Sequence, residues 1–162
     1  MTVTELFDPP DVDREYAAWK ANCGPCALAA VLRRPVAGVR DLFPRYPKQP
    51  WTNPTHMRAA LTSAGVGHRV MKAAPVYGLL FVQLAGPWTE PGANVLAAYR
   101  HTHWVGYAKR ADGRPMIYDI NARGWLWRDQ WEEEIMSAIL AHTKRATGFW
   151  ARTAIELTGD AA

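Results

Sequence analysis

The chain has 162 residues, of which 49% are apolar and 21% charged, and this composition favours a globular protein with a sizeable core over a disordered chain. Its formal net charge is +4, but the basic side chains are scattered and form no Lys/Arg-rich run, so we expect no nucleic-acid partner. Two cysteines only three positions apart also exclude a secreted disulfide framework.

We expect one domain over residues 1–162, with residues 1–12 as an irregular N-terminal arm. This arm is acidic and contains two consecutive prolines, which is unlike a signal peptide, and no apolar run approaches the ~18 residues of a membrane span. We therefore expect synthesis in the cytoplasm, without a signal peptide or transmembrane segment. Export by a dedicated machine or packaging into a virion would leave no mark in such a sequence.

Helical patterns dominate the first 65 residues. Asp13 and Thr55 are suitable N-caps, and Leu28, Val31 and Leu32 recur at helical spacing, so the helix that contains them buries one face. The predicted helices cover residues 14–20, 24–33, 36–43 and 56–64.

Strand patterns dominate the rest of the chain. Leu79 to Val82 is a continuous apolar run typical of a central strand, and Asp112-Gly113 is a turn signal between two strands. The predicted strands cover residues 67–71, 78–84, 103–109, 116–121 and 149–157, and one further helix covers 129–142. Helices followed by a mostly antiparallel sheet predict an α+β fold.

Cys23 begins the motif Cys-Gly-Pro-Cys, which runs directly into the helix over 24–33. Pro25 is tolerated in the first turn of a helix, so Cys23 is predicted to lie at the helix N-terminus. Partial positive charge gathers there and stabilises a thiolate over a thiol. Cys26 lies one turn inside the helix, where we expect it to pack rather than react.

A nucleophilic cysteine needs a histidine base and a group that orients the histidine. His103 lies on the strand over 103–109, and Asp119 and Asn121 lie on the next strand. If Lys109 pairs with Pro115, Asn121 is opposite His103 and Asp119 is its diagonal neighbour, and both are within reach. The charge of Asp119 favours it as the orienting group, while Asn121 remains an alternative.

These residues resemble the papain-like cysteine peptidases, most closely the bacteriocin-processing (C39-like) peptidases. Residues 23–29 match the Cys-Gly-Pro/Ala-x-x-Leu-Ala helix start of that family, and residues 103–107 are similar to its His-aromatic-Val-x-aliphatic strand. The resemblance implies N-terminal helices packed on an antiparallel sheet. It also implies hydrolysis of a peptide or isopeptide bond in a peptide or protein substrate, through a Cys23-His103-Asp119 triad and an acyl-enzyme, without a metal or other cofactor.

The chain departs from the family pattern at one position. The family usually carries a glutamine six positions before the nucleophile, where it donates a hydrogen bond to the oxyanion, but residue 17 is alanine here. Loss of one such donor typically costs ~10²–10³ in turnover. Lys20, Asn22 and Gln83 are candidates to replace it.

Other interpretations stay open. Ala17 favours a catalytically weak or inactive papain-like module that serves as a binding or structural component of a larger assembly. Cys-Gly-Pro-Cys is also the dithiol motif of thioredoxin-like redox proteins, although that motif normally follows a buried strand. Both cysteines, His101 and His103 are also candidate ligands of a zinc site. His101 is an alternative to His103 as the base. Finally, both cysteines are candidates for a purely structural role in the core.

The sequence contains eight tryptophans, which is many for its length. Several lie in predicted loops or near the histidine strand, where they either line a substrate cleft or pack in the core. The segment 86–100 is long enough to form a flap beside such a cleft. The predicted cleft residues are Trp51, Trp88, Trp104 and Trp125.

Overall fold

The structure is a computed structural model that describes residues 5–159, so residues 1–4 of the predicted arm lie outside the described residues. Its centre is a six-stranded antiparallel sheet in the order β1-β6-β2-β3-β4-β5, which confirms the α+β class and the antiparallel sheet. The strands are β1 (His68–Met71), β2 (Tyr77–Ala85), β3 (Thr102–Lys109), β4 (Pro115–Asp119), β5 (Gly124–Trp127) and β6 (Gly148–Leu157).

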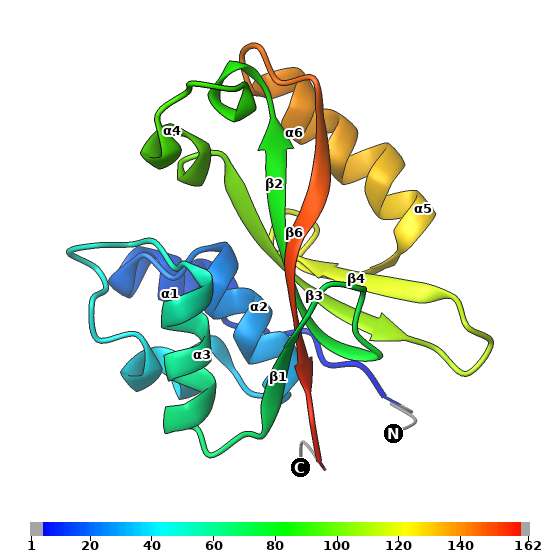
Figure 1. Cartoon of the computed structure of the whole chain (residues 1–162). Helices are drawn as coiled ribbons and strands as arrows, with labels where there is room; N and C mark the ends of the chain where they lie inside the picture. The colour runs from blue at the N-terminus through cyan, green and yellow to red at the C-terminus, as the bar shows by residue number, and fades with distance from the viewer. Residues whose placement is uncertain (1–4, 160–162) are drawn as a thin grey trace.

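The N-terminal helices cover one face of this sheet (Figure 1). Every residue of the second helix from Gly24 to Leu32 is buried, because this helix is enclosed by the sheet and by its helical neighbours. The layer consists of α1 (Val12–Trp19), α2 (Cys23–Leu32), the 3₁₀ helix η1 (Val36–Leu42) and α3 (Pro54–Ser63).

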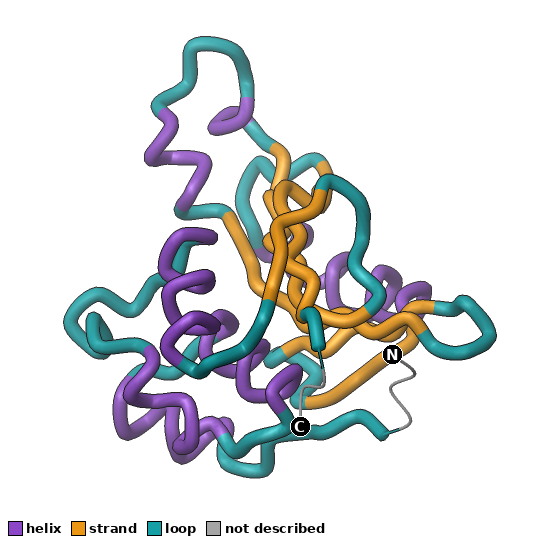
Figure 2. The backbone as a smooth tube through the Cα atoms, turned by 60° about the horizontal axis from the view of Figure 1, so that its bottom comes forward, coloured by secondary structure: helices purple, strands orange, loops and turns teal. Residues whose placement is uncertain are grey.

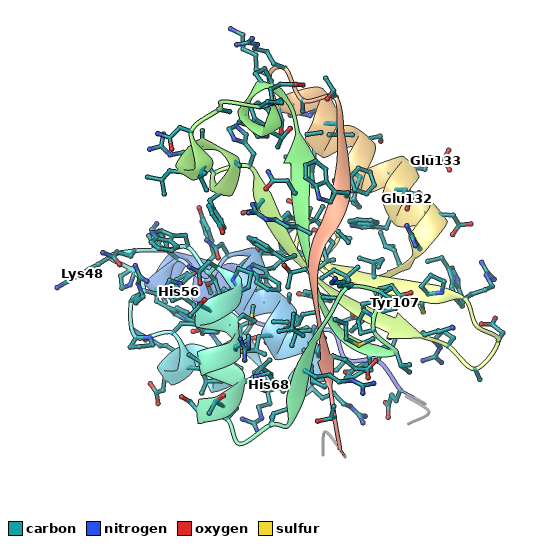
Figure 3. All side chains as sticks on the ribbon, viewed as in Figure 1. Lys48, His56, His68, Tyr107, Glu132 and Glu133 are labelled. Carbon is teal, nitrogen blue, oxygen red and sulfur yellow. The ribbon has the colours of Figure 1, made fainter. Side chains whose placement is uncertain are left out.

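A C-terminal helix covers the opposite face, so the sheet lies between two helical layers (Figures 1 and 2). This helix comprises α5 (Arg128–Gln130), the π-helical turn η3 (Trp131–Met136) and α6 (Ser137–His142). Val105 and Tyr107 of β3 pack with Trp131, whereas Trp104, directly before Val105, belongs to the α2 side, as strand alternation requires. Figure 3 shows Glu132 and Glu133 on this helix, away from His56 and Lys48 of the N-terminal layer.

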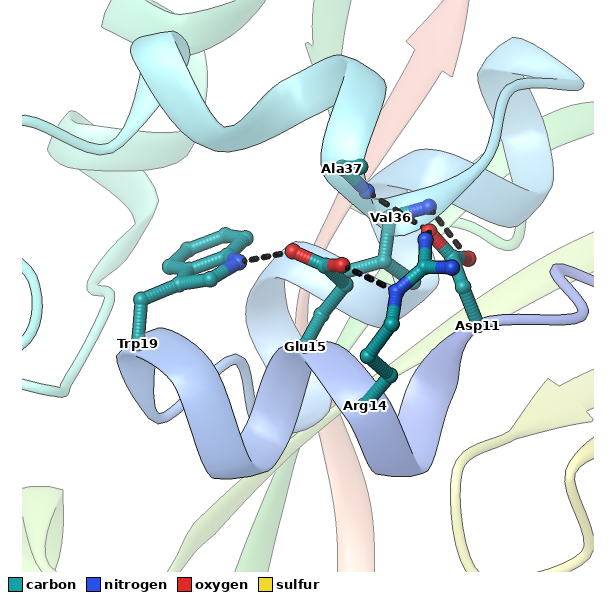
Figure 4. A network of polar contacts seen from close by, with 6 residues as sticks. All are labelled: Asp11, Arg14, Glu15, Trp19, Val36 and Ala37. Atoms are coloured by element: carbon teal, nitrogen blue, oxygen red, sulfur yellow. Dashed lines mark hydrogen bonds and ion pairs between the residues drawn. The ribbon is translucent and has the colours of Figure 1, made fainter.

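Buried carboxylates fasten the helical layer together (Figure 4). The helix predicted to start after Asp13 begins at Val12, and Asp11 instead accepts hydrogen bonds from the backbone N–H groups of Val36 (2.8 Å) and Ala37 (2.9 Å). Glu15 accepts a bond of 2.7 Å from the Trp19 indole. The Asp11 bonds hold the start of α1 against η1, and the Glu15–Trp19 bond lies within α1. Similarly, α3 is capped by Asn53 and not by Thr55.

In the β3–β4 hairpin Lys109 lies opposite Pro115, the pairing on which the expected positions of Asp119 and Asn121 were conditional. β4 pairs only with the second half of β3, from Gly106 to Lys109, because the chain turns away at Asp119. The first half of β3 is therefore uncovered on the β4 side. Two short helical segments, η2 (Pro87–Thr89) and α4 (Val95–Tyr99), lie between β2 and β3. Within residues 5–159, none of the helices is long and apolar enough to cross a membrane.

Candidate active site

Cys23 is the first residue of α2, as the Cys-Gly-Pro-Cys motif predicts. Gly24 is needed at this helix start, because a Cβ there would lie only 2.9 Å from Oγ1 of Thr52. Asn22 occupies the N-cap position, but its side chain makes no capping hydrogen bond to the helix. The amides at the start of α2 therefore keep their partial positive charge directed at the thiol.

The uncovered half of β3 supplies a hydrogen bond to the sulfur. Successive N–H groups along a strand point alternately to its two sides. The Lys109 N–H donates to the Val76 carbonyl on the β2 side, so the N–H of Trp104, an odd number of positions away, points away from β2. Because β4 does not pair there, the Trp104 N–H is free to bond the Cys23 sulfur, and it does so. The thiol therefore lies beside β3 where the pairing with β4 has ended.

His103 and Asp119 meet at the same end of the hairpin. His103 Nε2 donates to Oδ2 of Asp119 over 2.8 Å, and the imidazole forms a second hydrogen bond with Cys23. Since Nε2 is used by Asp119, Nδ1 is the ring nitrogen that faces the sulfur. Asp119 is completely buried, and His103 retains only 12% of its side-chain exposure. The structure therefore joins the three residues in one chain of hydrogen bonds.

A fourth residue, Trp131 of η3, completes this chain. Its indole Nε1 donates to Oδ2 of Asp119 over 2.8 Å, so this oxygen accepts from both Trp131 and His103. The other carboxylate oxygen accepts from the backbone N–H (2.8 Å) and the side-chain Nδ2 (3.0 Å) of Asn121. Four donors hold a buried carboxylate ionised. Asn121, predicted as an alternative orienting group, thus supports Asp119 and is not hydrogen-bonded to His103.

The electrostatics favour an ion pair between Cys23 and His103. Burial alone would raise the pKa of the Cys23 thiol, but the hydrogen bond and the positive charge of His103 outweigh it and lower this pKa. Burial opposes the charged imidazole too, yet Asp119, followed by Cys23, raises the pKa of His103 to about 10. The pKa of Asp119 is lowered, because the His103 charge overcomes the cost of burial. We call the resulting state the thiolate–imidazolium pair.

A cleft of about 560 Å³ opens beside Cys23. Among the lining residues, Trp51 is half exposed, whereas Trp104 is buried and donates its indole N–H to the Thr52 carbonyl (2.7 Å). The predicted flap over 86–100 contributes to the lining through α4. No carboxylate lies among the lining residues described in the structure, which are Asn22, Cys23, Pro50, Trp51, Thr52, Asn53, Phe81, Leu96, Tyr99, Arg100, Thr102 and Trp104.

Other predicted residues lie elsewhere. Trp88 stacks on His101 at 3.6 Å between ring centroids, and Trp125 donates its indole N–H to the Phe7 carbonyl (3.0 Å), so neither is part of the described cleft lining. His101 is bonded through Nδ1 to the Ala97 carbonyl (2.9 Å) and not to the thiol. The side chain of Lys20 lies over the Tyr16 ring.

The contacts of Cys26 and Gln83 support the fold and do not reach the reactive groups of the site. Cys26 is fully buried, its sulfur lies 3.7 Å from the Ala21 carbonyl, and burial raises its pKa to about 12. Both cysteines are free thiols, and a helix, not a strand, precedes the motif. The Gln83 amide donates to the carbonyls of Ala98 (2.9 Å) and His101 (3.2 Å), which fastens the end of α4 to β2.

Trp131 is the site residue that the sequence analysis did not identify. It lies in a segment with an ordinary helical signal, twelve positions after Asp119, and no spacing rule connects the two. The only hint is a tryptophan in an otherwise acidic helical turn, which needs a partner for its N–H once it is buried.

The chain was also compared with known proteins: no family model matches it, and neither does any curated protein.

Proposed function

We propose that this protein is a papain-like cysteine peptidase of the C39-like type, which cleaves a peptide or isopeptide bond through an acyl-enzyme. Cys23 is the nucleophile, His103 the base and acid, and Asp119 the orienting group. The observation that carries the proposal is the hydrogen-bonded chain from a buried carboxylate through an imidazole to a thiol at a cleft. Few structural roles for a cysteine require all three groups in this order.

The geometry supports the following reaction. The Cys23 thiolate attacks the substrate carbonyl carbon, a C–S bond forms, and the carbonyl electron pair moves to oxygen. When the tetrahedral intermediate collapses, the C–N bond breaks and the leaving nitrogen takes the proton from His103 Nδ1. His103, now neutral, then accepts a proton from water as the water oxygen bonds to the thioester carbon. The C–S bond breaks, which releases the carboxylic acid and regenerates the thiolate beside the imidazolium. Asp119 keeps the ring oriented throughout.

The test is alkylation of Cys23 by iodoacetamide at pH 6, followed by mass spectrometry. An ordinary thiol with a pKa of ~8.5 is less than ~1% ionised at this pH, so the thiolate–imidazolium pair should react ~10²-fold faster. We expect Cys23→Ala to abolish labelling and His103→Ala to slow it to the rate of an ordinary thiol, with both variants folded by circular dichroism.

Cys26→Ala is the matched control, because Cys26 is buried and its pKa is raised. This variant should retain rapid labelling. Labelling of the wild type only above pH 8, or equal labelling rates in the wild type and His103→Ala, would contradict the proposal. Turnover of p-nitrophenyl acetate, a simple activated ester, then measures acyl transfer in the same variants.

A binding or structural module on the same fold is the second candidate, and Ala17 is the observation that favours it. Residue 17 is an exposed alanine on α1, and its methyl side chain has no donor for an oxyanion. An inactive module would show alkylation without ester turnover. The redox alternative makes a different prediction, because oxidation would then join Cys23 and Cys26 in a disulfide that iodoacetamide no longer modifies.

A further inference from the structure

The proposed peptidase requires hydrogen-bond donors for the negative oxygen of the tetrahedral intermediate. The backbone N–H of Cys23 can supply one of them, because N–H groups in the first turn of a helix have no partner within it and the Asn22 side chain does not cap α2. A second donor normally comes from a side chain, and its loss costs ~10²–10³ in rate. Ala17 cannot provide it.

Two of the three candidate side chains are committed elsewhere. Both Gln83 and Lys20 are absent from the described lining of the cleft. The Gln83 amide nitrogen is bonded to backbone carbonyls, and its oxygen accepts from Arg152 (3.0 Å). Lys20 is exposed, with its ammonium 5.4 Å from the centre of the Tyr16 ring.

Asn22 differs from both in position and in hydrogen bonding. It directly precedes Cys23, it lines the cleft with Cys23, and its side chain is half-buried. Its Nδ2 donates one hydrogen to the carbonyl of Pro50 over 2.6 Å. An amide nitrogen carries two hydrogens, and residues 5–159 provide no partner for the second.

The contacts of Asn22 also fix which atom of its amide is the nitrogen. A carbonyl oxygen only accepts, so Pro50 must face the NH₂ group. The oxygen Oδ1 then accepts from the Tyr46 hydroxyl over 2.8 Å, and Thr52 Oγ1 lies 3.0 Å from the same hydroxyl. The donors run in one direction, from Thr52 through Tyr46 and Asn22 to Pro50. Burial raises the pKa of Tyr46 to about 12, which keeps its proton in place.

We propose that the free N–H of the Asn22 side chain and the backbone N–H of Cys23 together form the oxyanion hole. Tyr46 is a positioning residue that holds the Asn22 amide in this orientation. The inference depends on the proposed acyl transfer, and it replaces the donor that Ala17 lacks. When the thiolate attacks and the C–S bond forms, the electron pair placed on the carbonyl oxygen accepts both N–H groups; when the C–N bond breaks, the oxygen returns to a carbonyl.

Two reagents separate this role from activation of the thiol. Acylation of Cys23 by p-nitrophenyl acetate passes through a tetrahedral oxyanion, whereas iodoacetamide alkylates the thiolate by displacing iodide and forms no oxyanion. We expect Asn22→Ala to acylate ~10²–10³-fold more slowly than the wild type, while its alkylation rate at pH 6 changes less than ~3-fold. Asn22→Leu, which is similar in size but has neither a donor nor a charge, should show the same separation.

Further variants test the positioning role and the fold. Tyr46→Phe should slow acylation ~3–10-fold by releasing the Asn22 amide, again with little effect on alkylation. Gln49→Ala is the matched control, because it removes an exposed amide from the same loop outside the cleft, and it should leave both rates unchanged.

Each remaining outcome is decisive. Equal loss of acylation and alkylation in the Asn22 variants, or loss of neither, would overturn the inference. A wild type that is alkylated rapidly but not acylated would overturn it as well, because no working oxyanion hole would then exist. A wild type without rapid alkylation at pH 6 would instead refute the proposed peptidase itself.

Discussion

Asp119→Asn removes the buried charge that stabilises the imidazolium of His103. The contact between His103 Nε2 and Asp119 Oδ2 is 2.8 Å, so the centres of charge lie ~4 Å apart, and at an effective dielectric constant of ~20 their attraction is ~4 kcal/mol. The asparagine oxygen can still accept the hydrogen bond, which retains part of this energy. We expect the pKa of His103 to fall by roughly 2 units, within the usual effect of a neighbouring charge.

A lower pKa of His103 shifts the proton back to the thiol. Because the thiolate–imidazolium pair forms by proton transfer within the site, a fall of ~2 units should reduce the fraction of the pair by up to ~10²-fold. Alkylation of Cys23 by iodoacetamide, measured from pH 5 to 10, should therefore slow by ~10–10²-fold at pH 6 and recover near pH 9.

Asp112→Asn is the matched control, since Asp112 is exposed in the β3–β4 turn and its oxygen accepts a hydrogen bond from the Arg114 N–H. This variant should have the pH profile of the wild type. If Asp119→Asn also kept that profile, the carboxylate would not be coupled to the thiol, and the electrostatic reasoning would be wrong.

Three further predictions concern stability. Trp131→Phe keeps a ring in the core but removes a donor from the buried Asp119 carboxylate, so it should lower the free energy of unfolding by ~1.5–3 kcal/mol in urea titrations. In the control Trp125→Phe, the lost N–H bonded a neutral carbonyl, so the free energy of unfolding should fall by only ~0.5–1.5 kcal/mol. Equal losses in the two variants would argue against a charged acceptor at Trp131. Gly78→Ala should cost ~3 kcal/mol or more or prevent folding, because its Cβ would lie 2.0 Å from a backbone carbonyl of β6; a well-folded variant with wild-type melting temperature would disprove this. The thiolate–imidazolium pair carries as many protons as a neutral thiol and imidazole, so its contribution to stability should be flat between the ordinary pKa values of an imidazole, ~6.5, and of a thiol, ~8.5. That contribution should decline as the pH rises through about 10, where the imidazolium deprotonates, and as the pH falls through the lowered pKa of the thiol. Without the thiol, in Cys23→Ala, only the raised pKa of the imidazole remains, so stability should already decline above pH 6.5; identical pH profiles for both proteins would refute the pair.

The local features of the candidate site follow from short-range rules. Pro25 and the apolar spacing after it place a helix start at Cys23, and the Asp112-Gly113 turn predicts the hairpin, in which the structure pairs Lys109 with Pro115. Turn chemistry and side-chain periodicity act over a few residues, so the sequence alone reveals them. The resemblance to C39-like peptidases uses the same local patterns and remains a prediction.

The choice between Asp119 and Asn121 was not local. The register places Asn121 opposite His103 only if the strand continues, but β4 ends at Asp119 and the chain turns there. Asn121 consequently folds back onto the carboxylate, with 2.8 Å and 3.0 Å bonds, while Asp119 reaches His103. Where a strand ends depends on what packs beyond it, and sequence periodicity does not contain that information.

Long-range packing decided the remaining contacts of the candidate site. The C-terminal strand β6 lies between β1 and β2, and the helix that follows β5 brings Trp131 to Asp119 from the face opposite α2. Cys23 reaches His103 from the other layer only because β4 leaves half of β3 uncovered. The sequence by itself determined the helix start, the hairpin and the order of the reactive residues, since each depends on neighbours along the chain. The tertiary structure alone decided which donors surround the carboxylate and the thiol, because those contacts join residues from separate layers.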